Sequence, residues 1–144
     1  MPALPGQQRQ IEHLRSVRLF RSLSKKDLTA IARAGDEVKL AAGEEFVTEG
    51  AEGDAAYVLL EGSVTLKRNN RTLTTLGPGE IIGELAMLDK APRTATAICD
   101  TDCTLFRLDR MRFVGLIESV PALAHKVLQT LASRLRDLDS KYYG

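Results

Sequence analysis

The sequence predicts an α+β protein that is mainly β, in which a sandwich or barrel of short strands lies between two helical parts. Three features carry this prediction. Apolar residues follow helical spacing before residue 36 and again after residue 108, whereas residues 36–108 form short β-favouring segments separated by Gly, Asn, Pro and Asp. No linker interrupts the pattern, so we expect residues 1–144 to form one domain, with helices within 1–35 and 109–144.

The N-terminal part is expected to contain two helices. Residues 7–16 can form the first one. Ser24 stands three residues before Asp27, as in a capping box, in which a serine side chain accepts a hydrogen bond at the start of a helix. Leu28 and further apolar residues follow at helical spacing, and Gly35 is expected to end this second helix.

The central part contains short segments that favour strands, at the close spacing that is typical of an antiparallel sandwich or barrel. Asn69 and Asn70 predict a tight hairpin turn between two of them, because asparagine tolerates positive φ. The expected strands are residues 38–40, 45–48, 56–60, 63–67, 72–76, 94–98 and 104–108.

The C-terminal part is expected to form a pair of helices. Asp109 can cap the first one, and Pro121 suits the first turn of the second, where its missing N–H is not needed. A stripe of large side chains on the second helix is expected to pack against the strands as core, which is the commoner role, or to form a lid over a ligand or the seam of a homodimer, and these roles can coexist. The stripe consists of large side chains at heptad spacing on the second helix: Leu128, Leu131, Leu135, Leu138 and Tyr142.

Composition argues against several classes of protein. A net charge of +1 gives no field that would recruit nucleic acid, and no apolar run approaches the roughly 18 residues that a membrane span needs. Residues 1–10 lack the apolar stretch of a secretory signal, so we expect a cytoplasmic protein. Two cysteines and two histidines offer too little for a metal site or a catalytic triad, so we expect no metal and no enzymatic activity.

Residues 77–97 carry the strongest signal for a binding site. A strand is expected to end at Gly83, a short helical turn to follow over 84–88, and a loop to deliver Arg93 and Thr94 to the next strand. The N–H groups at the start of a short helix have no internal partners and can bind an anion. Arg93 adds a planar, permanently charged fork for phosphate oxygens, and Thr94 adds a hydroxyl donor.

Glu84 narrows the kind of anion. A carboxylate repels a phosphate, so it belongs in such a site only if it accepts hydrogen bonds from hydroxyls, as an acid does with a ribose in dinucleotide sites. Glu84 and Arg93 together therefore indicate a phosphate attached to a sugar. The simpler alternative is a plain ion pair between Glu84 and Arg93 across a turn, because charged residues are usually solvated surface.

The same segment resembles the phosphate-binding cassette of cyclic nucleotide-binding domains, a family that includes the catabolite activator protein and the regulatory subunits of cyclic-AMP-dependent kinase. The resemblance implies a double-stranded β-helix, that is, a jelly-roll-like β-roll, over residues 36–108, with the cassette at 83–96. It extends over nearly the whole chain. Its motifs are Gly83-Glu84-Leu85-Ala86 and Pro92-Arg93-Thr94-Ala95-Thr96-Ala97, with supporting segments at 19–24, 57–64 and 76–80.

This resemblance implies a role for each cassette residue. Arg93 would bind the equatorial phosphate oxygens, and Glu84 would bind the ribose 2′-OH. Thr94 would contact the phosphate, and in cyclic-GMP-binding relatives a threonine here also reaches the guanine. We therefore expect cAMP as the ligand and cGMP as the second choice. Backbone groups would come from Gly83, Leu85 and Ala86.

The resemblance also implies that the last helix moves over the nucleotide as a lid. Arg134, Arg136 and Leu138 are candidates to meet the base, and Tyr142 or Tyr143 could stack on it. We expect a non-catalytic sensor with an unidentified downstream protein and, because the chain ends directly after its last helix, no DNA-binding domain. Two alternatives stay open: a ligand-free structural or interaction module, and a regulatory fragment of a larger channel, kinase or transcription factor.

Overall fold

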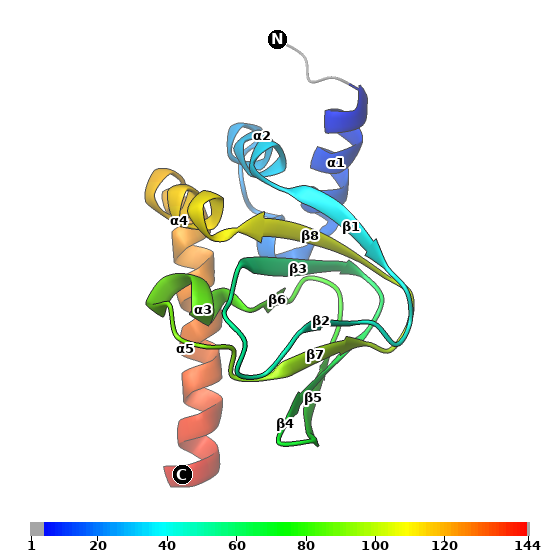
Figure 1. Cartoon of the computed structure of the whole chain (residues 1–144). Helices are drawn as coiled ribbons and strands as arrows, with labels where there is room; N and C mark the ends of the chain where they lie inside the picture. Colours follow the sequence, from blue (N-terminus) through cyan, green and yellow to red (C-terminus); the bar gives the residue numbers. More distant parts are fainter. Residues whose placement is uncertain (1–4, 144) are drawn as a thin grey trace.

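The computed structural model describes residues 5–143, except for the side chains of residues 5–7, 85 and 138–143. Helices stand at both ends of the chain and strands between them, as the sequence predicts (Figure 1). The N-terminal helices are α1 (Pro5–Ser16), the 3-10 turn η1 (Arg18–Phe20) and α2 (Lys25–Ala34). The C-terminal helices are α4 (Arg110–Ser119) and α5 (Pro121–Tyr143), and a short helix, α3 (Glu84–Asp89), lies between two strands.

Within residues 5–143, the strands form two antiparallel sheets of four strands each. The chain passes from one sheet to the other at each connection except the β4–β5 hairpin, so the two sheets close over a shared interior as a β-roll. The first sheet has the order β1 (Asp36–Leu40), β8 (Cys103–Asp109), β3 (Ala55–Glu61), β6 (Ile81–Ile82). The second has the order β2 (Glu45–Val47), β7 (Thr96–Cys99), β4 (Val64–Arg68), β5 (Arg71–Leu76).

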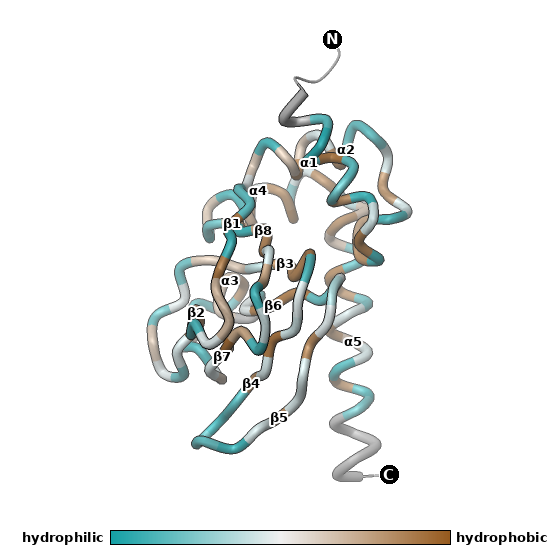
Figure 2. The backbone as a smooth tube through the Cα atoms, turned by 90° about the vertical axis from the view of Figure 1, so that its right-hand side faces the viewer, coloured by the Kyte–Doolittle hydropathy of each residue, from teal (hydrophilic) through white to brown (hydrophobic). Residues whose placement is uncertain are grey.

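Two clusters of buried apolar side chains hold the layers together. One lies between the sheets and includes Leu59 and Leu105. The other lies between the first sheet and the helices and includes Phe106 and Phe113. Strand β3 contributes alternate side chains to both clusters, which explains its continuous apolar sequence. In Figure 2 the tip of the β4–β5 hairpin is hydrophilic, as expected for a part that extends away from both clusters.

The structure confirms the local signals that the sequence carries. The side chain of Ser24 accepts a hydrogen bond from the backbone N–H three residues later at 3.1 Å, and Asp109 does the same at 2.9 Å. Each therefore satisfies a helix N–H that would otherwise lack a partner. Asn69 and Asn70 have φ of 51° and 63°, so they form the tight turn of the β4–β5 hairpin.

Gly35 ends α2 for a different reason from the one expected. Its backbone is extended, with φ −139° and ψ −177°, rather than left-handed. A Cβ at this position would meet the carbonyl oxygen of Arg107 at 2.5 Å and the ring of Phe106 at 2.7 Å. The glycine therefore lets the chain leave α2 in close contact with β8.

Helix α5 packs only part of the predicted stripe against the core. Leu128 is 63% exposed and Leu135 is 67% exposed. The side chains that pack toward the core are Leu123 and Val127, which are buried, and Leu131, which is partly buried. The prediction that the stripe packs against the roll is therefore wrong for Leu128 and Leu135. Within residues 5–143, α5 and the other helices are too short or too polar to cross a membrane.

Candidate functional site

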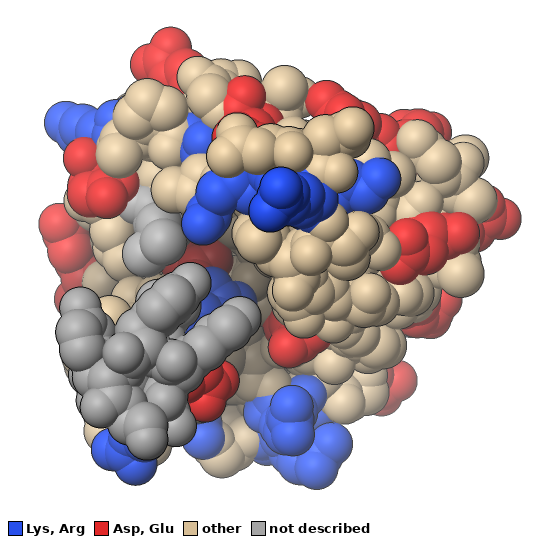
Figure 3. Space-filling view, turned by 90° about the horizontal axis from the view of Figure 1, so that it is seen from below, with Lys and Arg blue, Asp and Glu red and all other residues tan. Residues whose placement is uncertain are grey.

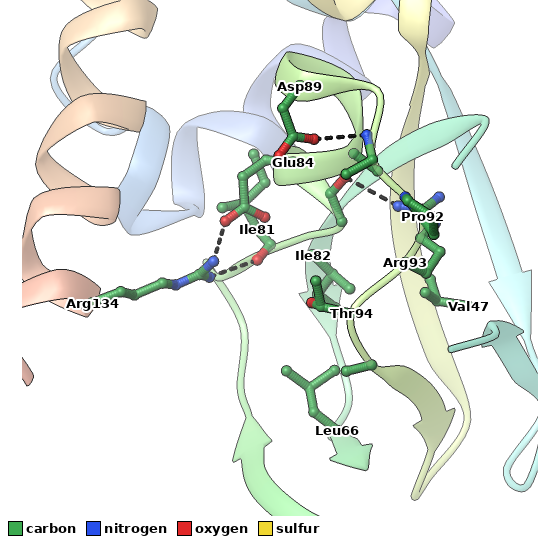
Figure 4. Close-up of a pocket in the computed structure, with 14 residues that line it drawn as sticks. Val47, Leu66, Ile81, Ile82, Glu84, Asp89, Pro92, Arg93, Thr94 and Arg134 are labelled. Atoms are coloured by element: carbon green, nitrogen blue, oxygen red, sulfur yellow. Dashed lines mark hydrogen bonds and ion pairs between the residues drawn. The ribbon is translucent and has the colours of Figure 1, made fainter. Parts of the chain in front are cut away.

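A cavity of about 130 Å³ lies where the β-roll, α3 and α5 meet (Figure 4). The strands of the roll supply its large aliphatic side chains, and α3, the loop before β7 and α5 supply its charged ones. Arg134 reaches in from α5 on one side, and Arg93 lies on the other (Figure 4). The lining residues are Val47, Leu66, Ile81, Ile82, Gly83, Glu84, Ala86, Asp89, Ala91, Pro92, Arg93, Thr94, Ala95 and Arg134.

Helix α3 begins at a glycine with a left-handed backbone. Gly83 is the N-cap residue and has φ 83° and ψ 14°, a conformation that costs other L-residues about 1–2 kcal/mol. A Cβ at Gly83 would also collide with Nη1 of Arg93. Glycine is therefore required twice here, and it lets the start of α3 and the guanidinium of Arg93 meet at the cavity.

Arg93 is buried, and both its side chain and its main chain are held in place. Nη1 donates to the carbonyl of Gly83 at 3.0 Å, and Nη2 donates to the carbonyl of Ala55 at 2.6 Å. The carboxylate of Asp54 lies 3.6 Å from Nη2. Two main-chain hydrogen bonds of 2.9 Å join Arg93 to residues 50–51. These contacts fix the orientation of the guanidinium, which lowers the entropy cost of binding a ligand.

Glu84 is 1% exposed and interacts with α5. Its Oε1 accepts a hydrogen bond from Nη1 of Arg134, whose Nη2 donates to the carbonyl of Ile81 at 2.9 Å. Burial raises the pKa of Glu84 above its ordinary value, although Arg134 and, more weakly, Arg93 act to lower it. The plain ion pair between Glu84 and Arg93 is therefore not what forms, since the partner of Glu84 is Arg134.

The structure brings most of the predicted cassette residues to one cavity. Gly83, Glu84, Ala86, Arg93 and Thr94 all line it, and so does Arg134 from the last helix. Arg136 is exposed and is not among the lining residues, so the prediction that it meets the base is not supported by this geometry. Four predicted residues have side chains outside the described part of the structure: Leu85, Leu138, Tyr142 and Tyr143.

Other residues at the cavity were not predicted from the sequence. Val47 and Leu66 line it from β2 and β4, and inward-facing positions of predicted strands could have indicated them. Asp54 lies near two arginines, at 3.6 Å from Arg93 and 3.4 Å from Arg107. No local pattern could have identified Asp54, because its partners lie far along the chain and on other elements.

The charges at this cavity suit a ligand that is both an anion and a hydroxyl donor. Arg93 supplies positive charge, and Glu84 supplies a buried acceptor. Basic and acidic side chains are mixed on the lower face of the molecule, which is hollowed near its middle (Figure 3). The cavity's own residues, rather than a charged face, would therefore select an anion.

The described residues give little support for a metal site or for a reactive cysteine. No group of three or more His, Cys, Asp or Glu side chains there is arranged to hold a metal ion. Cys99 and Cys103 are free and buried, and burial raises the pKa of the Cys99 thiol to about 12. A thiol of this pKa is protonated at neutral pH and is a poor nucleophile.

The family model described as "Cyclic nucleotide-binding domain" matches residues 37–120, which is more than half of the chain. The chain belongs to the cyclic nucleotide-binding domain family. The match contains the whole of α3 and the loop that carries Arg93, and all the residues that line the cavity except Arg134 lie within it.

Two curated relatives of this cyclic nucleotide-binding domain come from distant organisms. The chain is 38% identical over 102 residues to the cyclic AMP receptor protein of Thermus thermophilus, covering 67% of this chain and 47% of that protein. It is 37% identical over 101 residues to the cAMP-dependent protein kinase regulatory subunit of Eremothecium gossypii, covering 70% and 22%. The chain thus spans less than half the length of either relative.

Solved structures agree with this assignment. The catabolite activator protein of Thermus thermophilus has a TM-score of 0.79 at 33% identity, over 85% of this chain and 60% of that one. The regulatory domain of Toxoplasma gondii PKA, solved with cAMP, has a TM-score of 0.67 at 31% identity, over 81% and 46%. The cyclic nucleotide-binding domain described here therefore has the β-roll fold of these proteins.

Proposed function

We propose that this cyclic nucleotide-binding domain is a non-catalytic sensor that binds cAMP, with cGMP as its second ligand. The observation that carries the proposal is the buried carboxylate of Glu84 in the same cavity as the guanidinium of Arg93. An anion site accommodates an acid where the ligand also brings hydroxyl donors, and a sugar phosphate brings both. The two relatives named for cAMP support this choice of ligand.

In this proposal Arg93 binds the equatorial phosphate oxygens. Its guanidinium has five N–H donors, and the contacts to Gly83 and Ala55 use two of them, so donors remain for phosphate. Thr94, exposed at the cavity, adds its hydroxyl. Backbone N–H groups at the start of α3, from Gly83, Leu85 and Ala86, would complete the anion site.

Glu84 is proposed to accept a hydrogen bond from the ribose 2′-OH. The described hydrogen bond from Arg134 goes to Oε1, so we assign the ribose hydroxyl to the other oxygen, Oε2. The hydroxyl of a ribose can therefore bind Oε2 without displacing Arg134. The base preference is set less firmly, because Thr94 suits both a phosphate oxygen and a guanine.

The contact between Arg134 and Glu84 supports a lid role for α5. A ligand that binds Glu84 contacts the same carboxylate that Arg134 of α5 binds. Ligand binding and the position of α5 are therefore coupled. The response can be no larger than the difference in affinity between the two positions of the helix. Leu138 is a further candidate contact on this helix.

The phosphate role is tested by calorimetric titration of cAMP and cGMP into wild-type protein and Arg93→Ala. Loss of hydrogen bonds to a charged group costs about 1.5–3 kcal/mol, which is a roughly ten- to hundredfold loss of affinity. Arg107→Ala is the matched control, because Arg107 also pairs with Asp54 but does not line the cavity. Wild-type affinity in Arg93→Ala would contradict the role.

The main alternative is a structural or interaction module that binds no nucleotide. A ligand that binds the folded state raises the melting temperature by mass action. If the melting temperature of the wild-type protein does not move with millimolar cAMP or cGMP, this alternative replaces the sensor. AMP serves as the comparison ligand, because it shares the base and ribose but lacks the cyclic phosphate.

We further propose that α5 forms the seam of a homodimer. The supporting observation is that Leu128 and Leu135, seven residues apart, are 63% and 67% exposed. Sedimentation velocity of Leu128→Glu is expected to show a monomer where the wild type is a dimer. Met111→Glu is the control, since Met111 is 83% exposed on a different helix. A wild-type monomer at high concentration would contradict the seam.

The proposal treats residues 1–144 as one domain that acts in the cytoplasm on a downstream protein. Two buried, free thiols, Cys99 and Cys103, suit a reducing compartment. A single urea transition, seen equally by far-UV circular dichroism and by tyrosine fluorescence, is the expected behaviour of one domain. Two separate transitions would contradict it.

A further inference from the structure

Arg110, the first residue of α4, joins separate parts of the molecule. Its Nη2 donates to the carbonyl of Gly53 at 2.9 Å and to the carbonyl of Ala86 at 3.0 Å. Its backbone N–H donates to the carbonyl of Asp54 at 3.2 Å. Gly53 and Asp54 belong to the loop between β2 and β3, and Ala86 belongs to α3. One residue of α4 therefore bonds to this loop and to the cassette helix at once.

The side chain of Arg110 is held by carbonyls rather than by acids. Among the described residues, none of the ion pairs involves Arg110, and its buried Nε has no hydrogen-bond partner. Ala86 lies in a helix of six residues, where a carbonyl near the C-terminus lacks a helical partner and attracts a cation. The charged guanidinium of Arg110 therefore binds backbone carbonyls of the β2–β3 loop and of α3.

These two segments carry the two halves of the proposed nucleotide site. The loop holds Arg93, through main-chain hydrogen bonds from residues 50–51 and through the carboxylate of Asp54. Helix α3 carries Glu84 as its first residue, directly after the N-cap residue Gly83. The distance between loop and helix thus sets the distance between the guanidinium and the carboxylate.

Gly53 shows how closely the loop and α3 pack. A Cβ on Gly53 would collide with the Cβ of Ala86 and would lie 3.3 Å from Cζ of Arg93. The absence of a side chain lets the loop reach α3, and Arg110 bonds across this contact. The contact and the bond are two features of the same junction.

We propose that Arg110 is a positioning residue that fixes the spacing of Arg93 and Glu84 by clamping the β2–β3 loop to α3. The clamp itself is a property of the ligand-free protein, and its effect on affinity rests on the proposed nucleotide site. Arg110 is the first residue of α4, and α4 leads directly into α5. The clamp therefore also connects the cassette to the helix that carries Arg134.

The clamp is tested first without ligand, by amide hydrogen exchange in Arg110→Ala. We expect the amides of Glu84–Asp89 and of the loop to exchange about tenfold faster, while the β1–β8 pair keeps its wild-type rates. Arg112→Ala is the control, since Arg112 lies two residues later on α4 and bonds to Asp109 and Ala34 instead. Unchanged exchange in α3, or an equal increase everywhere, would overturn the proposal.

Gly53→Ala tests the same junction if Arg110→Ala does not fold. Its methyl group would push the loop away from Ala86, so the same local increase in exchange is expected. Combining Gly53→Ala with Arg110→Ala is expected to add little further increase, because both changes open one contact. Additive increases in the double variant would contradict a shared clamp.

Affinity for cAMP tests the positioning role under conditions where each variant is fully folded. Arg110→Ala is expected to bind cAMP about five- to twentyfold more weakly, with Arg112→Ala unchanged. A residue with a merely structural role would lower the melting temperature and leave the Kd of the folded protein unchanged, which would overturn the positioning role. If the wild-type protein binds no cAMP, the proposed function fails, and the exchange experiment still decides whether the clamp exists.

Discussion

Arg93 and Arg134 approach one cavity from opposite sides, and they are held in opposite ways. Arg93 is 6% exposed, and its guanidinium and its main chain are both bonded to neighbouring segments of the roll. The side chain of Arg134 is 41% exposed and comes from a single helix, and its contacts are to Glu84 and the carbonyl of Ile81.

The difference indicates that the two sides of the cavity have different roles. The side with Arg93 is part of the packed roll, so its geometry should change little when a ligand arrives. The side with Arg134 depends on one long side chain, and breaking its contacts would release α5 from the cavity while Leu123 and Val127 still pack against the core. A sensor needs both, because a fixed site gives affinity and a weakly held element gives a response.

The largest effect is expected from breaking the fixed side with Gly83→Ala. The methyl group would displace Arg93, and the positive φ would add about 1–2 kcal/mol of backbone strain. We expect cAMP affinity measured by calorimetry to fall about a hundredfold, at the upper end of the loss for a charged hydrogen bond.

Gly79→Ala separates strain from displacement. Gly79 also has a positive φ, of 95°, but a Cβ there would lie 3.5 Å or more from its nearest neighbours. This variant should lose stability in urea while keeping its affinity for cAMP. If both glycine variants weaken cAMP binding equally, the close contact between Gly83 and Arg93 is not what holds Arg93 in place for the ligand.

A smaller effect is expected on the lid side from Arg134→Ala. Arg134 acts on the ligand only through Glu84, so affinity for cAMP should fall less than in Gly83→Ala, roughly two- to tenfold. Amide exchange in α5 should rise while exchange in the roll stays the same. Arg136→Ala, an exposed change on the same helix, is the control, and equal effects from both variants would contradict the comparison.

The smallest effect concerns pH. The folded pKa of Glu84 is raised above 4.5 by burial, so its contribution to folding stability is fully present below about pH 4.5 and is lost as the pH rises through the raised pKa. The ionised form is the one that accepts a ribose hydroxyl, so affinity for cAMP should fall on acidification through the same range. Arg134→Ala should move the midpoint to higher pH, because Arg134 lowers this pKa.

Glu84→Gln is the control for this pH dependence. Glutamine does not titrate, so the affinity of this variant should be weaker but flat across the same range of pH. Calorimetric titrations at several pH values measure both proteins. A pH dependence that survives unchanged in Glu84→Gln would assign it to another group.

Most of the fold could be predicted because its signals are local. The caps at Ser24 and Asp109 and the turn at Asn69 and Asn70 each depend on residues within a few positions. The cassette is local too, since Gly83 and Arg93 are only ten positions apart, at the two ends of α3 and the loop that follows it. Such features can be predicted from sequence because the chain itself brings their parts together.

The rest of the site depends on packing between distant elements. Arg134 was a candidate for the base, but its bond to Glu84 spans 50 residues and needs α5 to lie against the roll. Asp54 and Arg110 have partners on other elements for the same reason. The heptad stripe on α5 predicted a helix correctly but not which of its faces is buried, because Leu123 and Val127 compete with it.

Recognition of a nucleotide at this cavity depends most on Glu84 as the acceptor for the ribose 2′-OH, and one measurement tests this role directly. Calorimetry compares cAMP with 2′-deoxy-cAMP on wild-type protein and on Glu84→Gln. The wild type is expected to prefer cAMP by about tenfold or more, as for a hydrogen bond to a charged group, and the variant should lose most of that preference. A preference that is absent in the wild type, or that persists in full in Glu84→Gln, would contradict the account.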